Sequence, residues 1–188
     1  MSVSAWVALV HHPVLNHEHA VVATAITNLD VHDIARVART YGLQGYFVVT
    51  PIERQRELVA RIIEHWCEGH GAKRVPERAD AMRLVETAPT LEDAVCRVTV
   101  LAGRRPLVVA TCARPGRATI GFTELRGLLR SAQPVLLVLG TGWGLADEIL
   151  FSADHVLDPV TAPGSDYNHL SVRTAAAVIM DRLLAWPS

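Results

Sequence analysis

Three glycines at alternate positions, Gly140, Gly142 and Gly144, end the apolar run Val135–Leu139. Glycine allows a backbone to come unusually close either to neighbouring backbone or to a bound ligand. One glycine would suffice for a plain strand-to-helix turn, so three of them favour a ligand site. A nucleotide-binding P-loop is excluded, because the GxxxxGK[ST] pattern is missing and the single lysine, Lys73, lies elsewhere.

A dinucleotide-binding or class I methyltransferase turn is one alternative for this stretch, because Asp158 follows where a ribose-binding carboxylate would fall. Those folds place the glycine turn after their first strand, whereas only one more strand and one helix are expected after Gly144. The turn therefore indicates a ligand site built from the C-terminal part of the chain.

A second irregular segment, Asp158–His169, follows the last expected strand and contains two prolines, one glycine and several small polar residues. A long irregular segment inside a compact domain is usually functional or disordered, and its position between a buried strand and an Ala-rich helix favours order. Asn168 or Ser171 can cap that helix, whose free N–H groups suit a polar or anionic ligand. The two segments are expected to form one pocket.

The elements that must position these segments alternate between strand-like and helical patterns, which predicts one α/β domain over residues 1–188 with a mainly parallel sheet flanked by helices. A further β-like run, Ala20–Ile26, indicates a hairpin or an extended connection. The expected strands are Ala5–Val10, Tyr46–Val49, Arg83–Glu86, Leu107–Thr111, Val135–Leu139 and His155–Leu157. The expected helices are Val31–Tyr41, Arg54–Glu68, Leu91–Leu101, Phe122–Arg130, Leu145–Ala153 and His169–Ala185.

Composition excludes several classes of protein. The 188 residues are 50% hydrophobic and 20% charged, and the formal net charge is −1, so no bulk charge attracts nucleic acid or a membrane. No apolar run reaches the roughly 20 residues of a membrane span, and three scattered cysteines form no disulfide framework. We expect a cytoplasmic protein without a metal, because the spacing of His65, Cys67 and His70 does not place them on one helix face.

Three segments together resemble the SPOUT superfamily of RNA methyltransferases, whose α/β fold has a C-terminal trefoil knot. Ala25–Gly42 is similar to the first motif of that superfamily, Leu139–Glu148 to the glycine-bearing second motif and Tyr167–Leu183 to the third. The HDIAR and GTGWGL stretches look more narrowly like a bacterial subfamily of SAM-dependent RNA methyltransferases without an added RNA-binding domain. Asp30 stands where the ribose-methylating branch usually has asparagine, so the substrate of that branch is not carried over.

The resemblance implies S-adenosylmethionine (SAM) as the cofactor and Arg36, Asp30 and Ser171 as catalytic candidates. Asp30 and Ser171 are equally well explained as helix caps, and Arg36 as a solvated helix arginine. Asp33 is explained better as a first-turn acid than as a catalyst. The residues expected around the cofactor are Leu139, Gly140, Gly142, Pro159, Val160, His169, Leu170 and Ser171.

The resemblance also implies a tRNA or rRNA substrate, with methylation of a base nitrogen or a ribose oxygen, and a homodimer in which Arg36 approaches the partner's cofactor loop. Arginines of the N-terminal half are expected to form an RNA-binding stripe, although such runs are more often a solvated face. The alternative is a noncatalytic module that binds an adenosine ligand or RNA. This alternative is favoured if Arg36 points away from the pocket. A nicotinamide-dependent oxidoreductase is less favoured.

Overall fold

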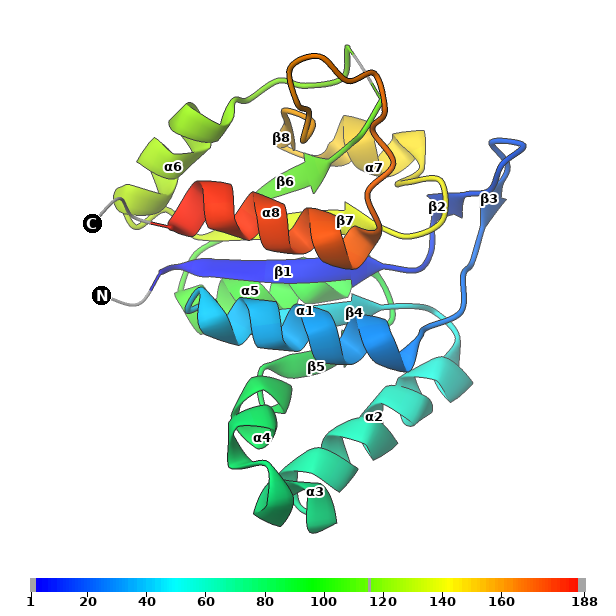
Figure 1. Ribbon diagram of the computed structural model, residues 1–188, viewed down its shortest axis with the longest axis vertical. Coiled ribbons are helices and arrows are strands. Elements are labelled where there is room, and N and C mark those ends of the chain that lie inside the picture. The colour runs from blue at the N-terminus through cyan, green and yellow to red at the C-terminus, as the bar shows by residue number, and fades with distance from the viewer. Residues whose placement is uncertain (1–2, 115, 186–188) are drawn as a thin grey trace.

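The computed structural model describes residues 3–114 and 116–185. Its centre is a six-stranded, entirely parallel sheet in the order β5-β4-β1-β7-β6-β8 (Figure 1). All six expected strands are present, and β5 begins two residues later than predicted. Their bounds are Ala5–Val10 (β1), Gly45–Val49 (β4), Val85–Ala88 (β5), Leu107–Thr111 (β6), Val135–Gly140 (β7) and His155–Leu157 (β8).

The expected connection after the first strand is a small antiparallel hairpin of β2 (Val14–Leu15) and β3 (Val21–Val22). Two short helices, α3 and α4, were not predicted, because segments of five and seven residues are too short to show a helical period. The helices are Asn28–Thr40 (α1), Glu53–Cys67 (α2), His70–Arg74 (α3), Pro76–Met82 (α4), Leu91–Ala102 (α5), Phe122–Arg130 (α6), Asp147–Ser152 (α7) and Val172–Leu184 (α8).

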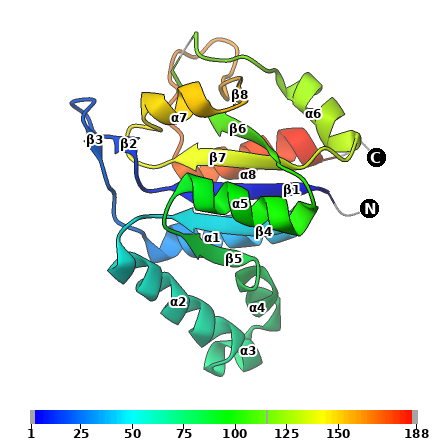
Figure 2. The ribbon, with the colours of Figure 1, turned by 180° about the vertical axis from the view of Figure 1, so that it is seen from behind.

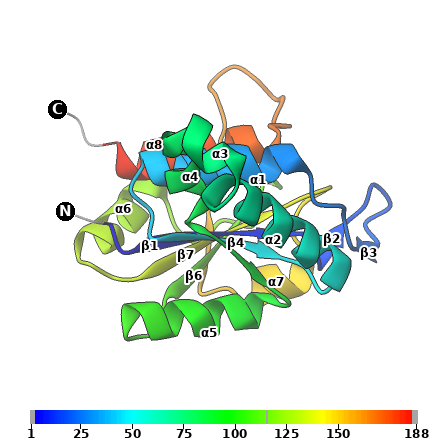
Figure 3. The ribbon, with the colours of Figure 1, turned by 90° about the horizontal axis from the view of Figure 1, so that it is seen from below.

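Helices cover both faces of the sheet, which explains why its strands are apolar without alternation. One core lies beneath α1, α6 and α8, and the other lies beneath α5 and α7. Figure 3 shows α5 on one side of the sheet and α1 beside α8 on the other, and Figure 2 shows α5 from its own side. Because every strand runs in the same direction, all the loops that leave their carboxyl ends meet at one edge.

The chain is threaded at that edge. The segment between β6 and α6 arches over the end of β8, because Ile120 pairs with Leu157 on the side of β8 that faces away from β6. The chain enters β8 from α7 on one face and leaves it for α8 on the opposite face, so it passes through the loop that this arch closes. This is the threading that the expected trefoil knot requires, and apolar periodicity alone could not predict it.

None of the helices in the described part of the chain is both long enough and apolar enough to cross a bilayer.

Candidate functional site

A cavity of about 1010 Å³ lies at the carboxyl edge of the sheet, where loops leave β6, β7 and β8. This is the edge at which parallel α/β sheets usually bind ligands. The N-terminal end of α1 and the β2–β3 hairpin complete its wall. All eight residues that were expected around a cofactor line this cavity: Leu139, Gly140, Gly142, Pro159, Val160, His169, Leu170 and Ser171.

The glycine turn lies against the β2–β3 hairpin. A Cβ on Gly142 would be 2.8 Å from the carbonyl oxygen of Leu15, and the φ of Gly142 is +61°. A Cβ on Gly140 would be 2.6 Å from the backbone nitrogen of Leu145, and Gly144 has a φ of +101°. The turn forms part of the ligand cavity, but chain geometry itself requires each of its three glycines. Their number alone is therefore weaker evidence for a ligand than the sequence suggested.

The loop between β8 and α8 contributes cavity-lining residues whose backbone N–H groups have no acceptor within the described part of the protein. Among the described residues, the N–H groups of Val160, His169 and Leu170 donate to no protein acceptor, and Gly142 adds a fourth such group from the glycine turn. Leu139 and Ile179 contribute buried apolar surface nearby. An apolar slot bordered by free N–H groups suits an adenine ring, whose edge carries hydrogen-bond acceptors. The cavity therefore fits the adenosyl part of SAM.

Ser171 is the N-cap of α8, as one of its two explanations predicted. Its Oγ accepts a hydrogen bond from the backbone N–H of Thr174 at 3.3 Å and lies 2.9 Å from the Thr174 hydroxyl. Helix α8 therefore begins at Val172, three residues after the expected start at His169. Asn168 is not the cap, and its side chain instead donates to the carbonyl of Ala113 across the cavity mouth.

Asp30 is a largely buried carboxylate in the cavity wall. Its explanation as a helix cap is wrong, because α1 begins earlier and Thr27 is its N-cap, accepting from the N–H of Asp30 at 3.1 Å. The Asp30 carboxylate accepts from the Thr27 hydroxyl at 2.5 Å and from the Arg173 guanidinium at 2.9 Å. These contacts fix both oxygens, and each oxygen keeps a lone pair for a ligand.

Arg36 does not line this cavity. Its exposed side chain borders a separate groove of about 660 Å³ between α1, α2 and α4. Asp33 lies in the second turn of α1 rather than the first, and its carboxylate is 3.4 Å from the Arg173 guanidinium. Within one chain, Asp30 and Ser171 are therefore brought together and Arg36 is kept apart.

A buried polar network ties the glycine turn to β1. His11 is fully buried, its Nδ1 lies 3.1 Å from the Thr24 hydroxyl, and that hydroxyl lies 2.5 Å from the Thr141 hydroxyl. Burial lowers the pKa of His11 from 6.5 to about 4, against a smaller opposing effect of Asp30. The imidazole is therefore neutral at physiological pH.

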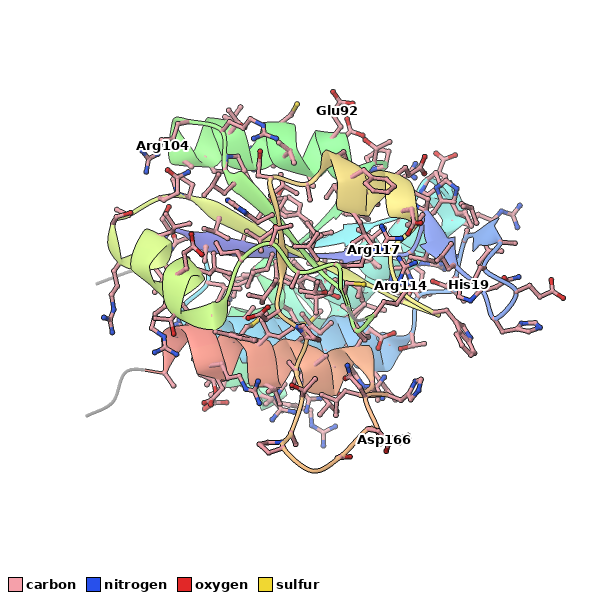
Figure 4. The ribbon with its side chains drawn as sticks, turned by 90° about the horizontal axis from the view of Figure 1, so that it is seen from above. His19, Glu92, Arg104, Arg114, Arg117 and Asp166 are labelled. Atoms are coloured by element: carbon pink, nitrogen blue, oxygen red, sulfur yellow. The ribbon has the colours of Figure 1, made fainter. Side chains whose placement is uncertain are left out.

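The arch between β6 and α6 is attached to α7 by Asp147. Its carboxylate is 2.8 Å from the Arg114 guanidinium and 3.3 Å from that of Arg117. Figure 4 shows Arg114 and Arg117 side by side, with Asp166 at the tip of the neighbouring β8–α8 loop. The hydrogen bond from Arg114 holds the pKa of Asp147 below its usual value. This attachment positions one wall of the cavity.

Sequence reasoning missed the partners that hold the site. Arg173 lies 143 positions from Asp30, and nothing in the sequence connects the two residues. The Thr27–Asp30 pair could have been found, because a threonine three residues before an acid is a capping-box pattern. No group of three or more potential metal ligands gathers among the residues described, at His65, Cys67 and His70 or elsewhere.

Comparison with known proteins agrees with this architecture. A family described as SAM-dependent RNA methyltransferase matches residues 4–185. A tRNA (guanine-N(1)-)-methyltransferase from Oleidesulfovibrio alaskensis is 48% identical over 177 residues, which cover 94% of this chain and 41% of that relative. The chain therefore spans less than half the length of that relative. A protein from Aquifex aeolicus is 38% identical over 181 residues, which cover 96% of this chain and 88% of the relative.

Solved structures show the same fold. The crystal structure of the Aquifex aeolicus TrmH/SpoU tRNA modifying enzyme superposes with a TM-score of 0.58 at 17% identity. The match covers 97% of this chain and 74% of that one. At this identity the likeness establishes the arrangement of strands and helices, and the chemistry depends on the residues of this chain.

Proposed function

The chain belongs to the SAM-dependent RNA methyltransferase family, and from that premise we propose that it methylates a ring nitrogen of guanine in tRNA. The residues expected at the cofactor all line one cavity, and Asp30 is the largely buried carboxylate beside it. That placement is the observation that carries the proposal. The relative's name, tRNA (guanine-N(1)-)-methyltransferase, supports the choice of nucleotide, although more than half of that relative lies outside the match.

SAM would be held by the glycine turn and the β8–α8 loop, and when bound it supplies an electrophilic methyl group on a sulfonium. The free N–H groups of Val160, His169 and Leu170 would meet the adenine edge, and Leu139 would contact its face. This arrangement leaves Asp30 on the α1 side of the cavity for the nucleotide that accepts the methyl group.

Asp30 is suited to act as the base at guanine N1. N1 carries a proton that must leave as the nitrogen attacks the methyl carbon and the carbon–sulfur bond breaks. A carboxylate accepts that proton directly, and Thr27 and Arg173 hold its oxygens in one orientation. A fixed base and a fixed cofactor lower the barrier by positioning, which contributes on the order of 7–11 kcal/mol in favourable systems.

A second copy of the chain is part of the proposal. Arg36 lies outside the cavity of its own chain, which would favour the noncatalytic alternative if the chain acted alone. In a homodimer formed through α1 and α8, Arg36 would approach the partner's cavity and complete it. Exposed Leu170, just before the N-terminal end of α8, supports such a contact.

The test is methyl transfer from isotopically labelled SAM to a pool of tRNA transcripts, followed by nucleoside analysis. We expect labelled 1-methylguanosine. Label found only in ribose-methylated nucleosides would contradict the guanine assignment. Binding of SAM without any transfer, measured in the dimer, would favour the noncatalytic module.

A further inference from the structure

A groove of about 660 Å³ between α1, α2 and α4 carries a concentration of positive charge that lies outside the proposed methylation site. Three arginines from three different helices line it: Arg36 from α1, Arg61 from α2 and Arg78 from α4. His32 and His65 lie in the same wall. Because these arginines are 17 to 42 positions apart in the chain, only the packing of the helices brings them together.

The positive charge in the groove is not neutralised. Among the described residues, none of the three guanidinium groups pairs with a carboxylate. Asp33 is the acid in the lining, and it faces Arg173. The pKa of His32 is lowered by burial first and then by Arg78, as expected in a region of positive potential. Unpaired guanidinium groups gathered in one groove suit an anionic ligand.

An aromatic residue holds part of this surface in place. The Arg78 guanidinium lies 4.5 Å from the centre of the Trp66 ring, and the rings of His32 and His65 meet Trp66 edge-on at 5.3 Å. Contact with an aromatic face fixes a guanidinium while leaving its N–H groups available. These contacts with Trp66 preorganise this part of the groove, because they restrict the side chains of Arg78, His32 and His65.

The groove begins where the cavity ends. At the N-terminal end of α1, Thr27 and Asp30 line the cavity, whereas Asn28 and Leu29 line the groove. From there the groove follows the α2 side of α1, whereas the opposite side of α1 packs against α8, which lies beside it in Figure 3. A strand lying in the groove would lead directly to Asp30.

We propose that this groove binds successive phosphates of the substrate RNA next to the nucleotide that is methylated, with Arg61 and Arg78 as its phosphate-binding residues. The inference rests on the proposed function, because it assigns the path of that same substrate. It also supplies RNA affinity to a chain whose net charge is −1. Electrostatic contacts of this kind make binding strongly dependent on salt.

The experiment measures binding of a fluorescein-labelled tRNA transcript by anisotropy over a series of salt concentrations. The chains compared are the wild type, Arg61→Gln, and the double variant Arg61→Gln/Arg78→Gln. We expect the double variant to bind roughly tenfold more weakly than the wild type. Its plot of log K against log[salt] should be less steep by about 1.4, which is twice the change expected for Arg61→Gln. The control, Arg97→Gln/Arg104→Gln, removes one arginine of α5 and a second one, Arg104, which Figure 4 labels on the α5 side of the sheet, and it should leave the slope unchanged.

Calorimetric titration with SAM and light scattering on the same samples separate the two proposals. If wild-type chain methylates tRNA while the groove variants bind RNA with unchanged affinity and slope, the groove assignment is wrong and the enzyme assignment stands. If the wild type binds neither SAM nor tRNA, both are wrong. If the groove variants convert a dimer into monomers, the groove is a subunit interface and the RNA assignment is overturned. The single variant Arg61→Gln is expected to fold normally, because Arg61 makes no ion pair among the described residues. A weaker binding of RNA by this variant is therefore not explained by misfolding.

Discussion

Asp30 is held from two sides, by the Thr27 hydroxyl from its own helix and by the Arg173 guanidinium from α8. We expect Asp30→Asn to reduce methyl transfer by about 10²- to 10⁴-fold, the range for loss of a general base. SAM affinity should stay within a few-fold, because the amide keeps the shape of the carboxylate. Single-turnover transfer and calorimetry measure the two effects.

Asp33→Asn is the matched control, because Asp33 also faces Arg173 but does not line the cavity. It should retain most of the activity. Equal losses in the two variants would mean that the negative charge near Arg173 matters for structure and that Asp30 is not the base.

His11 makes stability depend on pH. Burial lowers its pKa from 6.5 to about 4, so between these values the unfolded chain binds a proton that the folded chain does not. The resulting stabilisation of the fold, about 3 kcal/mol, is fully present above pH 6.5 and is lost as the pH falls toward 4. Urea unfolding at pH 7 and pH 4.5 should show this loss.

The comparison with His11→Asn isolates that histidine, because all other groups titrate in both proteins. The difference in unfolding free energy between wild type and variant should shrink as the pH falls. A difference that stays constant between pH 7 and pH 4.5 would show that His11 does not titrate differently on folding.

At the scale of elements, the glycine turn and the β2–β3 hairpin are one unit. Gly142→Ala should reduce stability by about 2–3 kcal/mol, because a positive φ and contact with the Leu15 carbonyl both oppose the new Cβ. Gly103→Ala shares a positive φ, +73°, but has open space around its Cβ, and should cost only about 1 kcal/mol. Urea unfolding measures the loss of unfolding free energy in both variants. Equal losses would mean that the β2–β3 hairpin shifts to make room for the new Cβ at position 142.

The arch between β6 and α6 depends on Asp147 for its attachment to α7. Asp147→Asn should weaken SAM binding roughly threefold, as expected for loss of a partly exposed ion pair. It should also speed tryptic cleavage after Arg117. Glu148→Gln, an exposed neighbour in the same helix turn, is the control for both measurements. Unchanged cleavage in Asp147→Asn would show that the arch is held by other contacts.

At the scale of the whole molecule, the proposed dimer shares its site between subunits. We expect light scattering at micromolar concentration to give two chains. Arg36→Gln and Asp30→Asn should each be nearly inactive alone, and mixing equal amounts with exchange of subunits should restore about a quarter of wild-type activity. Half of the dimers are then mixed, and each of these has one complete site. No recovery on mixing would place both residues in one subunit's site.

The sequence determined the strands and the edge of the sheet at which the ligand cavity lies. Apolar runs such as Ala5–Val10 and Leu107–Thr111 carry a local signal, because a strand buried on both faces must be apolar throughout. Parallel strands then place their following loops at one edge, so the residues of the glycine turn and of the β8–α8 loop could be assigned to one pocket. Family resemblance supplied the cofactor and the knot.

Only the tertiary structure showed which partners hold the side chains of the site, and which residues line the cavity rather than the groove. The pairing of Asp30 with Arg173 and the gathering of Arg36, Arg61 and Arg78 join residues from different helices, and such contacts leave no period or spacing in the chain. The same holds for the close approach of Gly142 to Leu15, which a local turn pattern could not distinguish from a ligand contact. Sequence pattern reports which face of an element is buried, whereas the partner across that face is set by packing.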